Sequence, residues 1–153
     1  MWIESVNSPH VTMFEKILVG ADDSDTARRA VEAAAEIAVM SKAELHIASA
    51  DAPKSFKATS NGEKFEAVNT EGDVDSLLQV LSFVAKKYGI EPILHPSHGD
   101  PAEALVSVAD ELGADLIVVG NRGMKGVRRV LGSIPNTVAH SANCSVLIVD
   151  TTD

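Results

Sequence analysis

The sequence predicts an α/β fold in which five parallel strands form one sheet with helices on both faces. Short apolar runs of strand length alternate along the chain with longer segments whose apolar residues recur at helical spacing. Residues 116–119 are continuously apolar, which is typical of a parallel strand covered on both sides. Hydrophobic residues make up 45% of the chain and aromatic residues only 4%, which indicates a core of small aliphatic side chains.

Five segments have the pattern of strands, and helical patterns separate them. The strands are expected at residues 14–20, 43–50, 90–97, 115–120 and 145–150, and the helices at 24–40, 73–88, 100–113 and 133–141. In the first helix an alanine-rich apolar stripe follows Asp23 or Ser24, either of which can cap it. Asp100-Pro101-Ala102-Glu103 combines a cap, a proline at the first position and a carboxylate at the third, and Gly113 ends that helix.

The domain organisation is simple. Residues 14–153 are expected to form one domain, preceded by a loose extension at 1–13 that has neither a basic start nor an apolar signal-peptide region. Residues 51–72 are polar and aperiodic, so a long flexible connection is expected there. If the first and fourth strands are neighbours, as in the order 3-2-1-4-5, the loops after them meet at the carboxyl edge of the sheet, where such sheets bind ligands.

Composition excludes several function classes. The net charge of −9 argues against nucleic acid or an anionic membrane as the main partner, because both need a basic surface. Cys144 is the only cysteine, so no internal disulfide is possible and a cytoplasmic location is expected. No apolar run approaches the roughly 18 to 20 residues of a membrane span.

The segment after the fourth strand has the features of an anion-binding loop. Glycines at 120, 123, 126 and 132 let backbone N–H groups approach a ligand, and Ser133 is placed to cap the helix that follows. Lys125, Arg128 and Arg129 add positive charge to an acidic chain. This order predicts a phosphate-bearing ligand, although the spacing fits neither a Walker A loop nor the dinucleotide fingerprint.

These features together resemble the universal stress protein family. The likeness rests on Gly120-x2-Gly123, Gly132-Ser133, the opening Lys16-Ile-Leu-Val-Gly-Ala-Asp22 and the ending Cys144-Ser-Val-Leu-Ile-Val149, and it extends from Phe14 onward. The resemblance implies a Rossmann-like fold of the adenine nucleotide alpha hydrolase type. The family's nucleotide-binding branch has nine residues between the second and third glycines of the motif, whereas this chain has eight, and Pro135 stands where a relative can have a hydroxyl residue.

The resemblance also implies a binding site for ATP or another adenine nucleotide, such as AMP or cyclic AMP, with Mg²⁺ as a possible companion ion. Asp22 would accept hydrogen bonds from the ribose hydroxyls, unless it serves only as a helix cap. The other implied contacts are Gly20 and Ala21 near sugar and base, Ala50 in the adenine pocket, Val119 and Gly120 at adenine and ribose, and Gly123, Gly132, Ser133 and Ile134 at the phosphates. Arg122 would reach a phosphate, while Arg128 and Arg129 either do so or remain solvated.

Three functions stay open: a nucleotide-binding stress or signalling module, a slow ATPase on the same site, and a dimeric interaction protein with a vestigial pocket. A phosphoreceiver role for Asp22-Asp23 is disfavoured because no aspartate ends the third strand, and the spacing of His95 and His98 is poor for a metal. Cys144 is expected to be a packed side chain. The apolar fifth strand lies at an edge in the expected order, which predicts a homodimer through that strand, as the resemblance also implies.

Overall fold

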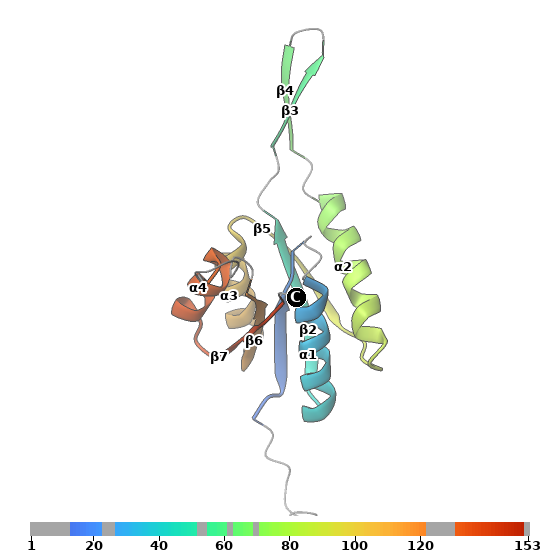
Figure 1. Ribbon diagram of the computed structural model, residues 1–153, viewed down its shortest axis with the longest axis vertical. Coiled ribbons are helices and arrows are strands. Elements are labelled where there is room, and N and C mark those ends of the chain that lie inside the picture. The colour runs from blue at the N-terminus through green and yellow to red at the C-terminus, as the bar shows by residue number, and fades with distance from the viewer. Residues whose placement is uncertain are drawn as a thin grey trace, which may run out of the picture.

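The computed structural model describes residues 13–22, 27–51, 55–60, 63–68, 71–121 and 131–151. Its main sheet consists of β1 (Lys16–Gly20), β2 (Glu44–Asp51), β5 (Ile93–His98), β6 (Leu116–Gly120) and β7 (Ser145–Val149). All neighbouring pairs are parallel and the order is β5-β2-β1-β6-β7 (Figure 1). Counted along the chain, these are the five predicted strands in the predicted order 3-2-1-4-5, so the fold class is confirmed.

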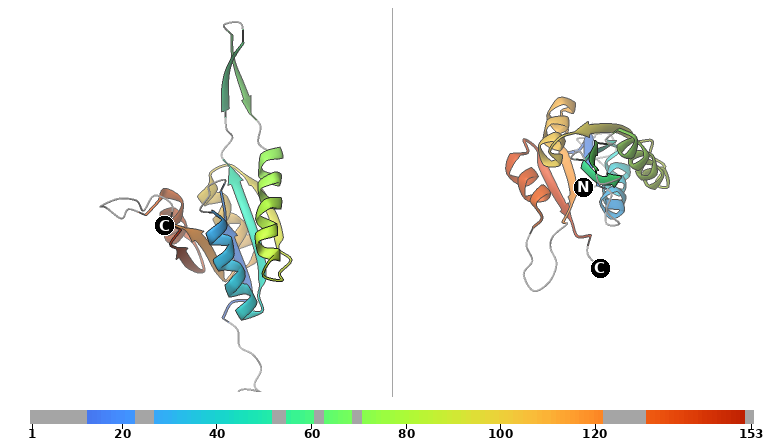
Figure 2. Two further views of the ribbon diagram at one scale, coloured as in Figure 1. Left: turned by 45° about the vertical axis from the view of Figure 1, so that its right-hand side comes forward. Right: turned by 90° about the horizontal axis from the view of Figure 1, so that it is seen from above.

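Two pairs of helices cover the two faces of this sheet. The helices are α1 (Ala27–Ser41), α2 (Glu71–Lys86), α3 (Pro101–Leu112) and α4 (Ser133–Ser141). One core cluster joins α1 and α2 to the face that carries Ile17 and Val19, and the other joins α3 and α4 to the face that carries Leu18 (Figures 1 and 2). The alternation of β1 side chains between two buried faces explains why its sequence is apolar without a break.

The helix ends follow the predicted signals most clearly in α3. The Asp100 carboxylate accepts a hydrogen bond from the Glu103 N–H at 3.0 Å, and Pro101 begins the helix. At the other end Gly113 adopts a φ of 67°, the left-handed conformation in which glycine is least strained. Both caps of α3 are therefore as the sequence predicts.

The segment between β2 and α2 differs from expectation. Two strands, β3 (Ser55–Ser60) and β4 (Glu63–Val68), pair antiparallel in a separate two-stranded sheet that extends from the carboxyl end of β2 (Figures 1 and 2). The sequence contains the reason, because Asn61-Gly62 between two short runs is a strong signal for a two-residue hairpin turn. The helix after it begins at Glu71, two residues before the predicted start. The flexibility of 51–72 stays a prediction.

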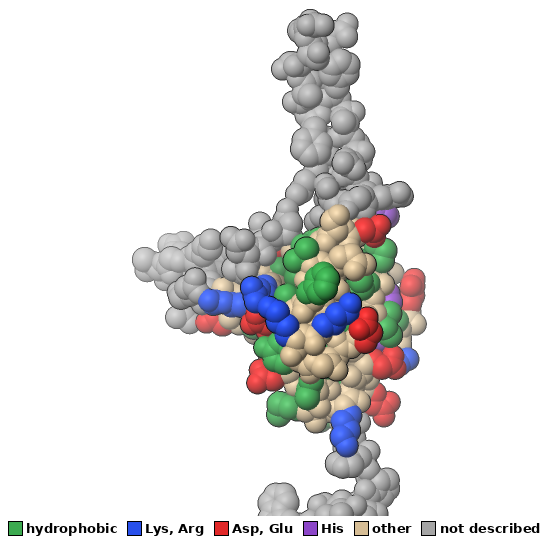
Figure 3. Space-filling view, turned by 90° about the vertical axis from the view of Figure 1, so that its right-hand side faces the viewer, with side chains coloured by type: hydrophobic (Ala, Val, Ile, Leu, Met, Phe, Trp, Pro, Cys, Tyr) green, Lys and Arg blue, Asp and Glu red, His purple; other side chains and the backbone are tan. Residues whose placement is uncertain are grey.

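The outer faces of α1 and α2 are mixed in character. Figure 3 shows hydrophobic side chains among charged side chains of both signs over this side of the molecule. The exposed apolar residues there include Met40 of α1 and Val80 and Phe83 of α2, and the Lys86 ammonium lies 5.4 Å from the centre of the Phe83 ring. None of the helices in the described ranges has the length and apolar content needed to cross a bilayer.

Candidate functional site

The carboxyl ends of β1 and β6 lie side by side, as the predicted site requires. The two strands pair from Ile17 with Leu116 through to Val19 with Val118, so Gly20 lies at the level of Val119. Asp22 follows β1 by two residues and is half-buried. The Val119 side chain is buried beneath α3, so a ligand at this edge would meet the backbone of Val119 and not its side chain.

Gly20 has a packing role that the sequence did not indicate. A Cβ atom at this position would lie 2.5 Å from Cδ2 of Leu105, which is buried on the inner face of α3. The absence of a side chain at Gly20 therefore lets α3 approach the sheet. Next to it, the Ala21 N–H donates to the Ala48 carbonyl of β2 at 3.0 Å, which continues the strand pairing one residue past β1.

Beyond Gly120 the chain is held by a hydrogen-bonded group that sequence reasoning missed. The Oδ1 atom of Asn121 accepts both the N–H and the hydroxyl of Thr151, each at 2.9 Å, and its Nδ2 donates to the Asp150 carboxylate at 3.1 Å. Asn121 and Thr151 are 5% and 3% exposed, so these polar groups are almost fully removed from water. The motif places Asn121 between two glycines, but nothing in the sequence pairs it with Thr151.

The start of α4 differs in one respect from prediction. Ser133 does not cap the helix: Gly132 is the cap residue, with φ −60° and ψ 162°, and as a glycine it has no side chain to bond to the helix start. Ser133 is the first helical residue, so its N–H and that of Ile134 have no partner within the helix, and Pro135 has no N–H to offer. Two backbone donors and the positive end of the helix dipole thus remain for an anion.

The structure describes only some of the remaining predicted contacts. Ala50 lies near the end of β2, with its backbone opposite Ser97 of β5. The Ile134 side chain is half-buried and packs against the core beneath α3 and α4. Ile134 would therefore contact a phosphate through its backbone N–H. Arg122 and Gly123 lie outside the described residues, as do the three cations at 125, 128 and 129.

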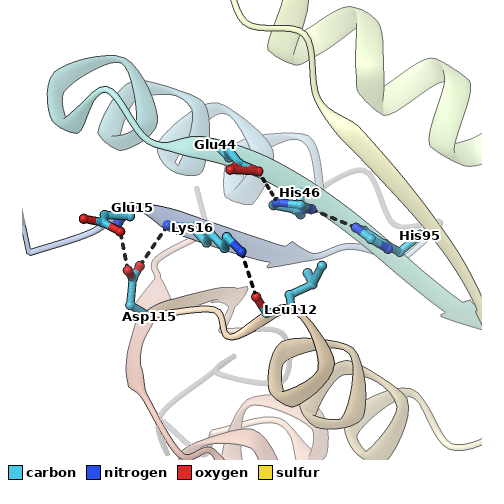
Figure 4. A network of polar contacts seen from close by, with 7 residues as sticks. All are labelled: Glu15, Lys16, Glu44, His46, His95, Leu112 and Asp115. Carbon is cyan, nitrogen blue, oxygen red and sulfur yellow. Dashed lines mark hydrogen bonds and ion pairs between the residues drawn. The ribbon is translucent and has the colours of Figure 1, made fainter.

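A second polar cluster lies on the face of the sheet that α3 covers. His46 of β2 and His95 of β5 point toward each other, with 2.8 Å between Nδ1 of His46 and Nε2 of His95 (Figure 4). His46 is 3% exposed, and its Nε2 lies 3.3 Å from the Glu44 carboxylate without forming a hydrogen bond. Burial, with a smaller effect from a charged His46, lowers the pKa of His95, and the Glu111 carboxylate opposes this shift.

At the amino ends of the strands, Asp115 joins β1 to the residues before β6. Its carboxylate accepts the N–H groups of Glu15 and Lys16 at 2.8 and 3.1 Å, while the Lys16 ammonium donates to the Leu112 carbonyl at 3.2 Å (Figure 4). These contacts join β1 to the α3–β6 connection, at the edge away from the candidate site. They are structural contacts.

Three other features of the described residues do not compete with this site. Cys144 is half-buried, and burial together with the Asp115 and Asp110 carboxylates raises its thiol pKa, so the reactive thiolate is disfavoured. A groove of about 270 Å³ lies between α3 and α4, but none of the predicted nucleotide contacts lines it. Within the described ranges, no three His, Cys, Asp or Glu side chains are grouped to hold a metal ion.

Comparisons with known proteins agree on one family. The sequence model of the Universal stress protein family matches residues 13–150. Universal stress protein Rv1636 of Mycobacterium tuberculosis is 36% identical, over 93% of this chain and 100% of the relative. Universal stress protein YxiE of Bacillus subtilis is 33% identical, over 90% of this chain and 99% of the relative. A universal stress protein solved in complex with cAMP superposes with a TM-score of 0.73 at 36% identity, covering 91% of this chain and 98% of that one.

Proposed function

Because this chain belongs to the universal stress protein family, we propose that it binds ATP or a related adenine nucleotide, AMP or cyclic AMP, and acts as a stress-response or signalling module. The observation that carries the proposal is the meeting of β1 and β6 at their carboxyl ends, where half-buried Asp22 follows β1 and half-buried Gly120 ends β6. Such an edge is where open parallel sheets bind nucleotides. The cAMP complex of a 36% identical relative supports an adenine nucleotide as the ligand.

The chemistry at this edge suits the parts of a nucleotide. A carboxylate at Asp22 can accept hydrogen bonds from both ribose hydroxyls of ATP or AMP, and from the one free hydroxyl of cyclic AMP, which gives preference to a ribonucleotide. The N–H groups of Ser133 and Ile134 at the start of α4 suit a phosphate, which the helix dipole also favours. Mg²⁺ would be bound by the phosphates of ATP and not by a cage of protein ligands.

Ligand binding by the purified protein tests the proposal. We expect saturable binding of at least one of ATP, AMP and cyclic AMP in titration calorimetry, with ATP titrated both with and without Mg²⁺. Phosphate release in the same samples would identify a slow ATPase. Failure to bind any of the three would refute the proposal and favour a dimeric interaction protein with a vestigial pocket.

Asp22→Ala separates ribose binding from helix capping. The variant should weaken ATP binding by about 1 to 3 kcal/mol, the usual range for hydrogen bonds to a charged group, and should weaken binding of 2′,3′-dideoxy-ATP far less. Equal losses for the two ligands would show that Asp22 acts through the fold. Gly132→Val provides an independent test of the phosphate contact: the backbone φ of −60° suits any residue, so a loss of affinity would reflect the added side chain.

We further propose that the protein is a cytoplasmic homodimer joined through β7. Among the strands that the structure describes, β7 pairs with β6 alone, and it lies at an edge of the main sheet. An edge strand invites antiparallel pairing with a second copy about a two-fold axis. Sedimentation at tens of micromolar should give a dimer, and Leu147→Pro, checked for a retained fold by circular dichroism, should shift it toward the monomer. A monomeric wild type would refute this pairing.

A further inference from the structure

Asn121 joins two segments that are separated by 30 residues in the chain. It follows β6 directly, at the start of the segment that carries the predicted phosphate contacts, whereas Thr151 and Asp150 follow β7. The Asn121 N–H also donates to the Val149 carbonyl at 3.0 Å, so both the backbone and the side chain of Asn121 are bound to the end of β7. All four contacts lie at the carboxyl edge of the sheet, beside the candidate site.

The surroundings leave these contacts little freedom. Thr151 packs so closely that a Cβ atom at Gly120 would lie 3.1 Å from its Cγ2. The Thr151 carbonyl in turn accepts a hydrogen bond from Arg29 of α1 at 3.4 Å. Removing the hydrogen-bond partner of a buried amide or hydroxyl costs free energy, because neither group can form a replacement bond with water. The position of Asn121 after β6 is therefore set by Thr151 as well as by the strand itself.

We propose that Asn121 is a positioning residue for nucleotide binding and that Thr151 is its anchor. The inference rests on the proposed function and deepens it. Asn121 need not touch the nucleotide; it fixes the point from which the chain sets out toward the start of α4. Since phosphate contacts require donors to be held within fractions of an ångström, a small shift at Asn121 weakens them more than it weakens the base and ribose contacts, of which those at β1 are unaffected.

The inference predicts a loss that depends on the phosphates of the ligand. Thr151→Val removes the hydroxyl donor to Asn121 but keeps the shape and the backbone N–H, so the fold is retained. It should weaken ATP binding by up to about tenfold, the limit reached if the whole free energy of one buried hydrogen bond serves to hold the phosphate donors, and should weaken adenosine binding far less. Thr151→Ser is the matched control, because it keeps the hydroxyl and should bind ATP nearly as the wild type does. Asn121→Ala should reproduce the ATP-selective loss more strongly.

Three results would count against the inference. Unchanged ATP affinity in both Thr151→Val and Asn121→Ala would overturn it. So would equal losses for ATP and adenosine accompanied by a lower melting temperature, since that pattern belongs to a purely structural contact. A wild type that binds neither ligand would refute the proposed function itself, an outcome that is distinct from the other two because it is seen before any variant is made.

Discussion

Gly20→Ala should destabilise the protein even when no nucleotide is present. The added Cβ would lie 2.5 Å from Cδ2 and 3.2 Å from Cδ1 of Leu105, whereas carbon atoms pack best at about 3.5 to 4.0 Å. Leu105 is 4% exposed and belongs to the core beneath α3, so it must change rotamer or push the helix outward. Overpacking of this kind costs about 1 to 3 kcal/mol, which urea denaturation of the nucleotide-free protein can measure.

Two further variants make the test sharper. Gly120→Ala at the neighbouring strand end is the matched control: its Cβ would lie 3.1 Å from Thr151 Cγ2, a milder conflict that should cost less. Leu105→Ala alone should cost about 2 to 5 kcal/mol, but combined with Gly20→Ala the total should fall below the sum, because the clashing methyl groups are gone. If Gly20→Ala kept full stability and lost only nucleotide affinity, the packing argument would be wrong and the glycine would serve the ligand.

Three other predictions concern the polar contacts. The pKa of His95 in the folded protein is lowered from 6.5, so the unfolded chain binds a proton at a higher pH than the folded protein does. The free energy of unfolding should therefore decline as the pH falls from about 7 toward the folded-state pKa, and His95→Gln should flatten that decline. Urea titrations of both proteins across this range would show whether the slopes differ, and parallel slopes would contradict the prediction. Asp115→Ala frees two backbone N–H groups and should cost about 1 to 3 kcal/mol by the same method, with no such cost if water replaces the carboxylate fully. Asp100→Ala should cost about 0.5 to 2 kcal/mol through loss of the α3 cap, and Asp100→Ser should restore most of it; equal stabilities of the two variants would remove the capping argument.

The parts of the fold that local sequence determines were predictable. Continuous apolar runs such as Leu116 to Val119 identified buried parallel strands, and the signals from Asp100 to Glu103 identified the start of α3. The strand order 3-2-1-4-5 was expected as the one in which the first and fourth strands are neighbours, so that the loops after them meet. The hairpin β3–β4 was also encoded locally, in Asn61-Gly62 and in the alternate apolar residues of its two strands, but these strands are short and mostly polar, and the prediction took them for a connection.

Contacts between distant segments were not predictable in this way. The pairing of Asn121 with Thr151 depends on where β6 and β7 end relative to each other, and that of His46 with His95 depends on the register of β2 and β5. A shift of one residue in either register would turn the side chains to the opposite face. The helix cap at Gly132 shows a related limit, because Ser133 has the preferred residue type for a cap but stands one position too late.

The central place of β1 in the sheet has a consequence for the order in which the chain folds. One edge of β1 pairs with β2, which follows within 30 residues, but the other pairs with β6, and the contact between Glu15 and Asp115 spans 100 residues. Closing a longer loop costs more entropy, so β1, β2 and their helices are expected to associate before β6 arrives. During synthesis, the side of the apolar strand β1 that pairs with β6 therefore remains unpaired until β6 has been made. A nascent chain that stalls before Leu116 should be the most aggregation-prone form of the protein, and chain growth through β6 should relieve it.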